Sequence, residues 1–246
     1  MPYPSQLVNR PCYGAKRRIA IQDVALTIIF DLDGTLIDTA PDLVETLNVI
    51  LTREGLSPLD YDRARNLVGG GAKAMIARGL EAEGRPCPPP KLEKLFADFI
   101  AHYSEHLTER SQPFPGVDVA LDALTECGYQ FAVCTNKLER LSINLLERFG
   151  LAERFAAICG PDTFGIEKPD PEILRRTLAA AGGTSQRAIM IGDSIVDIRT
   201  ARAAGIPVIT VDFGYSEHPV SELGPDRTIS SFVQLPMSIA AVSYGL

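Results

Sequence analysis

Residues 25–35 read ALTIIFDLDGT, and this stretch decides the architecture expected of the chain. A short apolar and β-branched run is followed at once by Asp31, Asp33 and Gly34. An apolar run of this length, bounded by turn residues, predicts a strand that is buried on both faces of a sheet. The aspartates then lie at the carboxyl end of that strand, which is where open parallel sheets bind their ligands.

Four more short apolar segments follow along the chain, and helix-like segments lie between them. This alternation predicts an α/β fold with a parallel sheet and crossover helices. The predicted strands cover residues 25–30, 130–134, 156–159, 188–191 and 207–211. Helices are predicted at residues 117–127, 138–149 and 171–181, each followed by the glycine that commonly ends a helix.

The alternation is interrupted between the first two strands, which are separated by about a hundred residues, far more than one crossover needs. Residues 41–110 read as helical hairpins and predict an inserted all-helical domain. Thr39 is expected to cap the first of its helices, the second follows Gly69-Gly70-Gly71, and the third covers residues 91–107. Residues 23–40 and 111–246 then form the α/β core.

The composition argues against several classes of protein. The chain has 24 Lys and Arg and 31 Asp and Glu, a formal net charge of −7 at pH 7, so nucleic acid and anionic membranes are not expected partners. No apolar stretch approaches the roughly 20 residues that span a bilayer. The 5 cysteines are odd in number and include no Cys-x-x-Cys pair, so neither a disulfide framework nor a zinc site is predicted. We expect a cytoplasmic monomer or homodimer.

Residues 1–22 are predicted to form a flexible N-terminal extension. The basic residues in this segment have no acidic residue near them up to position 18, which leaves a transit peptide as the alternative; they are Arg10, Lys16, Arg17 and Arg18.

Polar residues also lie next to the later strands. Thr135 and Asn136 follow the second strand, Lys168 precedes the fourth, and Asp193 follows the fourth, with Asp197 four positions further on. In a parallel sheet these side chains converge on one cleft. Each has a structural reading when taken alone, such as a turn or a helix cap.

Three aspartates at one sheet edge repel one another unless a cation compensates their charge. Asp31, Asp33 and Asp193 offer only oxygen atoms, which favours Mg²⁺ over Zn²⁺. Lys168 adds a positive charge and Thr135 a hydroxyl group. A site of this composition suits phosphoryl transfer, in which catalysis consists mainly of positioning and charge neutralisation.

Taken in order, Asp31-x-Asp33-Gly34-Thr35, Thr135-Asn136, Lys168-Pro169 and Gly192-Asp193-x-x-x-Asp197 resemble the four motifs of the haloacid dehalogenase-like hydrolase superfamily. The resemblance extends from about residue 27 to residue 214, and the helical insert lies where phosphatases of this superfamily have a cap. It implies a doubly wound, Rossmann-like core with an inserted cap.

The resemblance also implies a role for each motif residue. Asp31 would attack phosphorus and form an aspartyl-phosphate, and Asp33 would protonate the leaving oxygen and then activate water. Mg²⁺ would be held by Asp31, the carbonyl group of Asp33 and Asp193. Asp197 would orient Lys168 or a metal-bound water. The phosphoryl group would be bound by Thr135, Asn136 and Lys168.

The predicted substrate follows from the insert. Residues 66–80 are similar to the cap of phosphoglycolate phosphatases, with Gly69-Gly70-Gly71 where those enzymes usually have Gly-Asn-Gly. Gly70, Gly71 and Lys73 are therefore expected to bind substrate, and Arg78 is a further cation on the same segment. The prediction is a Mg²⁺-dependent phosphatase of a small phosphomonoester, 2-phosphoglycolate.

Three alternatives stay open: a phosphosugar phosphatase, a phosphosugar mutase, and a catalytically silent phosphate-binding module. The presence of both Asp31 and Asp33 argues against the silent module. Asp33 also argues against a dehalogenase, because that reaction has no phosphate ester to protonate.

Overall fold

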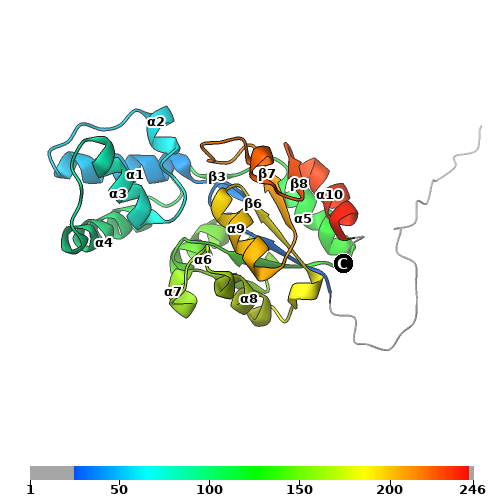
Figure 1. Ribbon diagram of the computed structural model, residues 1–246. Coiled ribbons are helices and arrows are strands. Elements are labelled where there is room, and N and C mark those ends of the chain that lie inside the picture. Colours follow the sequence, from blue (N-terminus) through cyan, green and yellow to red (C-terminus); the bar gives the residue numbers. More distant parts are fainter. Residues whose placement is uncertain (1–24, 244–246) are drawn as a thin grey trace, which may run out of the picture.

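The computed structural model describes residues 25–243, so the predicted extension at residues 1–22 lies outside the described part. The described residues form a six-stranded parallel sheet (Figure 1). Its strands are β1 (Thr27–Phe30), β4 (Gln130–Cys134), β5 (Ala157–Cys159), β6 (Ala188–Gly192), β7 (Val208–Val211) and β8 (Arg227–Ile229).

The strand order is β5-β4-β1-β6-β7-β8, with β1 in the interior of the sheet. The chain first runs outward from β1 to β4 and β5, then returns to the other side of β1 and runs outward again through β6, β7 and β8. The direction of winding therefore reverses between β1 and β6, and such a switch point opens a crevice at the carboxyl ends of the strands. The predicted doubly wound α/β fold is confirmed.

Successive residues of a strand point to opposite faces of the sheet. Because the inner strands are apolar along most of their length, both faces carry apolar side chains, and helices cover both. Ile28 and Phe30 of β1 belong to one apolar cluster, formed with helices α5 (Val117–Glu126), α6 (Glu139–Arg148) and α10 (Leu235–Ser243). Ile29 belongs to a second cluster, formed with α8 (Pro171–Ala180) and α9 (Ile195–Ala204). Both faces are buried, which explains why β1 reads as a continuous apolar run.

The insert consists of four helices that lie beside the core domain (Figure 1, left): α1 (Ala40–Arg53), α2 (Tyr61–Arg65), α3 (Ala72–Ala82) and α4 (Pro89–Glu105). Leu47 of α1, Ile76 of α3 and Phe99 of α4 are fully buried in their shared core. Helix α4 begins two residues before the predicted position because prolines fit the first turn of a helix, where no backbone N–H is needed.

The insert joins the core through a small antiparallel pair that the sequence does not reveal, β2 (Ile37–Asp38) and β3 (Gln112–Pro113). Thr39, between β2 and α1, was expected to cap α1, and this expectation is wrong: its side chain makes no capping bond. Its hydroxyl donates instead to Asp33 Oδ1 at 2.8 Å. The hydroxyl of Tyr215 accepts hydrogen bonds from the N–H groups of Thr39 and Ala40, at 2.7 and 2.9 Å, so the start of α1 needs no cap from Thr39.

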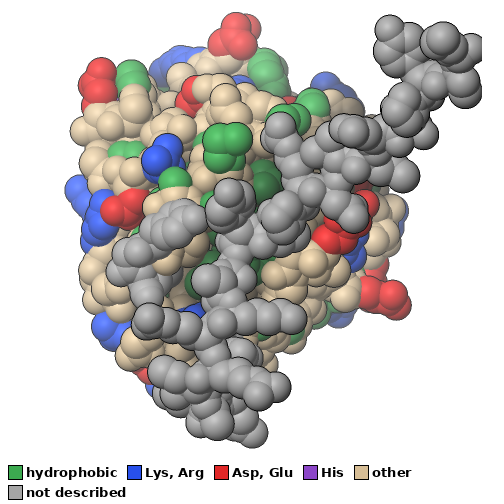
Figure 2. All heavy atoms as spheres, turned by 90° about the vertical axis from the view of Figure 1, so that its right-hand side faces the viewer, with side chains coloured by type: hydrophobic (Ala, Val, Ile, Leu, Met, Phe, Trp, Pro, Cys, Tyr) green, Lys and Arg blue, Asp and Glu red, His purple; other side chains and the backbone are tan. Residues whose placement is uncertain are grey.

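Figure 2 shows the side of the molecule that lies on the right in Figure 1. On the described part of this surface, charged side chains of both signs are interspersed with apolar side chains. Between residues 25 and 243, no helix has the length and apolar character needed to cross a membrane.

Asp42 ties the two connections between insert and core together. Its buried carboxylate accepts hydrogen bonds from the backbone N–H groups of Arg110 and Ser111, at 2.9 and 2.8 Å, and from the Ser111 hydroxyl at 2.6 Å. Asp42 is in the first turn of α1, and its partners directly precede β3. The carboxylate therefore fixes the entry and exit of the insert relative to each other.

We expect Asp42→Ala to lower the free energy of unfolding by about 3 kcal/mol, because it leaves buried N–H groups without an acceptor. Asp118→Ala is the matched control, since Asp118 is an exposed acidic residue in the first turn of α5, and its loss should cost less than about 1 kcal/mol. Urea unfolding of both variants measures the difference. Equal losses would show that Asp42 acts only on the helix dipole.

Candidate active site

A cavity of about 350 Å³ lies between the carboxyl ends of the core strands and the helical insert. Its lining includes all the residues that the sequence predicts as catalytic or substrate-binding and all three predicted metal ligands. They are Asp31, Asp33, Gly70, Gly71, Lys73, Thr135, Asn136, Lys168 and Asp193. Asp197 lies behind this wall and is fully buried. The fold therefore brings together residues that are far apart in the sequence.

Lys168 is the positive centre of the site. Its ammonium lies 2.9 Å from Asp31 Oδ1 and 2.6 Å from Asp197 Oδ1, and its side chain is 2% exposed. Burial alone lowers the pKa of Lys168, but the charges of Asp197 and Asp31 outweigh burial and raise the pKa above its usual value. Lys168 therefore stays charged, and its position is fixed by two carboxylates.

The carboxylates near Lys168 carry more negative charge than it neutralises. Burial raises the pKa of Asp31 to about 6, although the charge of Lys168 lowers it. Burial, followed by the charges of Asp197 and Asp31, raises the pKa of Asp193 well above its usual value. Oxygen atoms of the three aspartates lie within 4.8 Å of one another. This donor set fits a hard divalent cation.

Asp197 differs from the other two because its oxygens are already engaged. Its Oδ2 accepts hydrogen bonds from the backbone N–H groups of Asp193 and Ser194, at 3.2 and 3.1 Å, and from the Ser194 hydroxyl at 2.6 Å. Its Oδ1 accepts from Lys168. A side chain at Gly192 would collide with Asp197, since an added Cβ would lie 2.4 Å from its Cγ. Asp197 is thus built to hold Lys168 and the loop after β6.

Asp33 points away from this cluster. Its carboxylate accepts a hydrogen bond from the Thr39 hydroxyl and forms an ion pair with Lys137, whose Nζ lies 2.9 Å from Oδ1. Next to it, Gly34 has a φ of +80°, and a Cβ there would lie 2.4 Å from Asp193 Oδ2. The glycine lets the turn bring Asp31 and Asp193 together while Asp33 faces another side of the cavity.

Lys137 is a site residue that the sequence analysis missed. It follows the predicted Thr135-Asn136 pair directly, and its side chain is only 4% exposed. Its ammonium also donates to the hydroxyl of Tyr103 in α4, at 2.8 Å. Its place after a predicted strand was the available signal, but the sequence cannot show that this lysine turns inward.

Thr135 and Asn136 act on their neighbours as well as lining the cavity. The Thr135 hydroxyl accepts a hydrogen bond from Lys137 N at 3.2 Å. The Asn136 amide donates to the carbonyl oxygen of Lys168 at 3.0 Å and accepts from its N–H at 2.8 Å. The side chain of Asn136 thereby fixes the backbone that carries Lys168.

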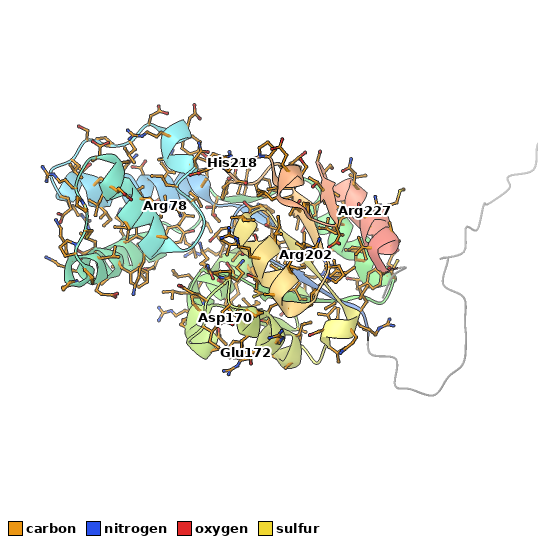
Figure 3. The ribbon with its side chains drawn as sticks, viewed as in Figure 1. Arg78, Asp170, Glu172, Arg202, His218 and Arg227 are labelled. Carbon is orange, nitrogen blue, oxygen red and sulfur yellow. The ribbon has the colours of Figure 1, made fainter. Side chains whose placement is uncertain are left out.

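Lys73 and Arg78, the two cations of the insert that the sequence singles out, are held by partners on the insert. Lys73, about half exposed, pairs with Glu93 at 2.6 Å. Arg78, on α3 (Figure 3), donates to the carbonyl oxygens of Gly69 and Ala74. Arg78 therefore supports the glycine loop, in which Gly69, Gly70 and Gly71 all have positive φ.

Tyr215 links the acidic cluster to the junction with the insert. Its N–H donates to Asp193 Oδ2 at 2.7 Å, and its hydroxyl donates to Asp38 Oδ1 at 2.7 Å. The guanidinium of Arg65, from α2, lies 5.0 Å from the centre of the Tyr215 ring. Arg65 also donates to the carbonyl oxygens of Phe213 and Gly214, at 3.2 and 2.8 Å. The insert thus contacts the core directly beside Asp193.

An aspartate cluster with a buried lysine, at the switch point of a doubly wound sheet and under a helical insert, is an arrangement suited to phosphoryl transfer. Comparison with known proteins agrees with this class. The chain belongs to the haloacid dehalogenase-like hydrolase family, whose model matches residues 28–211. The resemblance inferred from the sequence motifs is confirmed.

Proteins similar to this chain over most of its length include phosphoglycolate phosphatases. A phosphoglycolate phosphatase of Mesorhizobium japonicum is 46% identical over 213 residues, covering 87% of this chain and 94% of that protein. A phosphoglycolate phosphatase of Agrobacterium fabrum is 47% identical over 207 residues, covering 84% of this chain and 89% of that protein. The crystal structure of a predicted phosphoglycolate phosphatase from Haemophilus somnus superposes with a TM-score of 0.79 at 26% identity, covering 87% of this chain and 97% of that one.

The raised pKa values lead to a prediction about metal and pH. Without a cation, the folded protein binds protons at Asp31 and Asp193 more tightly than the unfolded chain does. Its stability therefore falls as the pH rises from about 4 through about 6. We expect Mg²⁺, at about 100 times its Kd, to stabilise the chelator-treated protein by about 2.7 kcal/mol at neutral pH and by much less near pH 5.

Thermal unfolding with and without Mg²⁺ at the two pH values measures this effect. Asp193→Asn should remove most of the Mg²⁺ response, whereas Asp170→Asn should leave it unchanged, because Asp170 caps α8 on the outer surface (Figure 3). A response to Mg²⁺ that is equal at both pH values would contradict binding by these carboxylates.

Proposed function

We propose that this protein is a Mg²⁺-dependent phosphatase that hydrolyses 2-phosphoglycolate to glycolate and phosphate. The single observation that carries the proposal is the pairing of two aspartates with different surroundings: Asp31 beside Lys168 and the acidic cluster, and Asp33 beside Lys137 and Thr39. Two groups with separate tasks are what nucleophilic attack and proton transfer require. The phosphoglycolate phosphatases at 46% and 47% identity support the choice of substrate.

Asp31 is the proposed nucleophile. Lys168 and the N–H of Leu32 both bind its Oδ1, at 2.9 and 2.7 Å, which fixes the rotation of the carboxylate. In the first step an oxygen of Asp31 forms a bond to phosphorus while the bond between phosphorus and the glycolate oxygen breaks. Lys168 and Thr135 are proposed to bind the phosphoryl oxygens during this transfer.

Asp33 is the proposed proton carrier. It gives a proton to the departing glycolate oxygen and then accepts a proton from the water that attacks the aspartyl-phosphate. That second attack releases phosphate and restores the carboxylate of Asp31. Thr39 keeps the Asp33 carboxylate turned toward the leaving group.

Mg²⁺ would be held by the carboxylates of Asp31 and Asp193 and by the carbonyl group of Asp33, and when bound it would neutralise negative charge on the phosphoryl group. Asp197 is proposed to act indirectly, by orienting Lys168 and the loop that carries Asp193.

Residues 41–110 are proposed to act as a cap over the cavity. Gly71 supports this reading, because a Cβ at this position would lie 3.4 Å from the carbonyl oxygen of Asn136, so the glycine loop approaches the core closely. Gly70 and Gly71 would then present backbone to the substrate and help to exclude water. We also propose that the protein is cytoplasmic and a monomer or homodimer. The thiols of Cys134 and Cys159, at paired positions of β4 and β5, form no disulfide, which fits the reducing compartment of this location.

A panel of phosphomonoesters tests the substrate assignment. We expect kcat/KM for 2-phosphoglycolate to exceed that for hexose 6-phosphates and for simple alkyl phosphates by about tenfold or more, because the cap closes on a small leaving group. The measurement is phosphate release with Mg²⁺ present. A higher kcat/KM for a hexose phosphate would contradict the assignment and favour a phosphosugar phosphatase, and isomerisation of a sugar bisphosphate would favour a mutase.

Asp33→Asn tests the division of labour between the two aspartates. Nitrophenolate leaves without a proton, so the variant should still transfer phosphate from p-nitrophenyl phosphate to Asp31. Hydrolysis of the aspartyl-phosphate should be slower than in the wild type by a factor of about 100 or more. Stopped-flow absorbance should then show a burst of one nitrophenolate per site, followed by slow turnover. A loss of the burst itself would mean that Asp33 is needed for the first step with every leaving group.

A further inference from the structure

Lys137 divides the hydrogen bonds of its ammonium between two residues of the cavity, Asp33 and Tyr103. A lysine ammonium carries three hydrogens. In this protein one side of the ammonium faces the Asp33 carboxylate, with Oδ1 at 2.9 Å and Oδ2 at 3.3 Å, and another donates to the Tyr103 hydroxyl at 2.8 Å. All three residues line the cavity. The bond to Oδ2 is the longest of the three, so a bound anion can take over this donor while Asp33 Oδ1 and Tyr103 remain partners of Lys137.

Tyr103 supplies a second available donor next to the first. Its hydroxyl oxygen accepts from Lys137, and among the described residues no acceptor is found for its own hydrogen. Tyr103 is 1% exposed. Burial, together with the charges of Asp33 and Asp42, raises its pKa well above the usual value, so the hydroxyl keeps its proton. The two donors come from different parts of the chain, Lys137 from the core and Tyr103 from α4.

The surroundings favour an anion at this position. Phe96, Phe99 and Leu141 give the cavity apolar walls beside the two donors, and a charge-assisted hydrogen bond is stronger in such surroundings than in water. The acceptor must also be compact, because the ammonium and hydroxyl are only 2.8 Å apart. A carboxylate, with two oxygens on one carbon, meets both conditions.

The other cations near the cavity are committed elsewhere. Lys168 lies between Asp31 and Asp197 on the phosphoryl side. Lys73 pairs with Glu93, and its ammonium lies 4.9 Å from the centre of the Phe96 ring. Arg78 holds the carbonyl oxygen of Gly69. Lys137 is the buried cation that lies beside Asp33, the group proposed to protonate the leaving oxygen.

We propose that Lys137 and Tyr103 together bind the carboxylate of the leaving group and so determine specificity. The inference rests on the proposed function, because Asp33 marks the side of the cavity where the leaving group lies. The substrate class is phosphate esters of short 2-hydroxy acids. In these esters the carboxylate is bonded directly to the carbon that carries the phosphate ester oxygen. A carboxylate held by both residues would also bridge core and cap, so the correct leaving group favours the closed arrangement.

The test uses ligands that are not hydrolysed, so that the chemistry of Asp33 does not enter. 3-Phosphonopropionate is the methylene analogue of 2-phosphoglycolate, and propylphosphonate has a methyl group in place of the carboxylate. We expect the wild-type protein with Mg²⁺ to bind 3-phosphonopropionate at least about tenfold more tightly, as measured by calorimetry. Lys137→Met should reduce this preference to within about threefold, and Tyr103→Phe should reduce it partly.

Propylphosphonate affinity in each variant serves as the internal reference for an intact phosphoryl site. Lys94→Met is the matched control, because Lys94 is an exposed lysine on α4, and it should keep the full preference. Lys73→Met tests the rival cation that the sequence favoured, and it should keep the preference as well.

The inference is overturned if the wild type binds both ligands equally, or if Lys137→Met and Tyr103→Phe keep the wild-type preference. A preference lost in Lys73→Met and kept in Lys137→Met would assign the carboxylate to Lys73. Failure of the proposed function gives a different result: the carboxylate preference and its dependence on Lys137 persist, but 2-phosphoglycolate is not hydrolysed.

Discussion

The ammonium of Lys168 lies between two buried carboxylates, 2.9 Å from Asp31 and 2.6 Å from Asp197, and most of the site depends on this contact. Removing one partner of a buried ion pair leaves an uncompensated charge, which is strongly destabilising. The surrounding residues are arranged to keep the lysine in place: Asn136 binds both backbone groups of Lys168, and Asp197 is held in turn by the loop after β6. The remaining negative charge around Asp31 and Asp193 is what makes the site suited to a divalent cation.

The same edge of the sheet separates two environments. Asp31 shares its surroundings with carboxylates and Lys168, whereas Asp33, two residues later, shares its own with Lys137, Thr39 and the Tyr103 hydroxyl bound to Lys137. The turn that follows β1 accounts for the separation, because Gly34 has a positive φ and redirects the chain. Contacts from the insert reach both environments: Tyr103 on the Asp33 side, and Arg65 through Tyr215 on the Asp193 side. Movement of the insert would therefore change the two environments together.

The sequence predicts the sheet well because its strands are buried on both faces and read as apolar runs, and the motif residues follow from their places at strand ends. It misses β8, in which Arg227 is exposed and only Ile229 is buried, and α10, where apolar residues such as Met237 are exposed and the helical period is unclear. It also misses Lys137, because the direction of a lysine side chain depends on partners that are distant in sequence. Tyr103, 34 positions from Lys137, is such a partner.

Asp31 is proposed to carry the phosphoryl group during turnover, and chemical trapping of the phosphoenzyme tests this role most directly. Borohydride reduces an acyl phosphate to an alcohol, so quenching the enzyme during steady-state hydrolysis of 2-phosphoglycolate should convert Asp31 to homoserine. Peptide mapping by mass spectrometry would locate the change, with enzyme quenched before addition of substrate as the reference. We expect homoserine at position 31 alone. Modification of Asp33 or Asp193 instead would contradict the assignment of Asp31 as the nucleophile. An unmodified Asp31 in enzyme that has accumulated phosphoenzyme during turnover would contradict it as well.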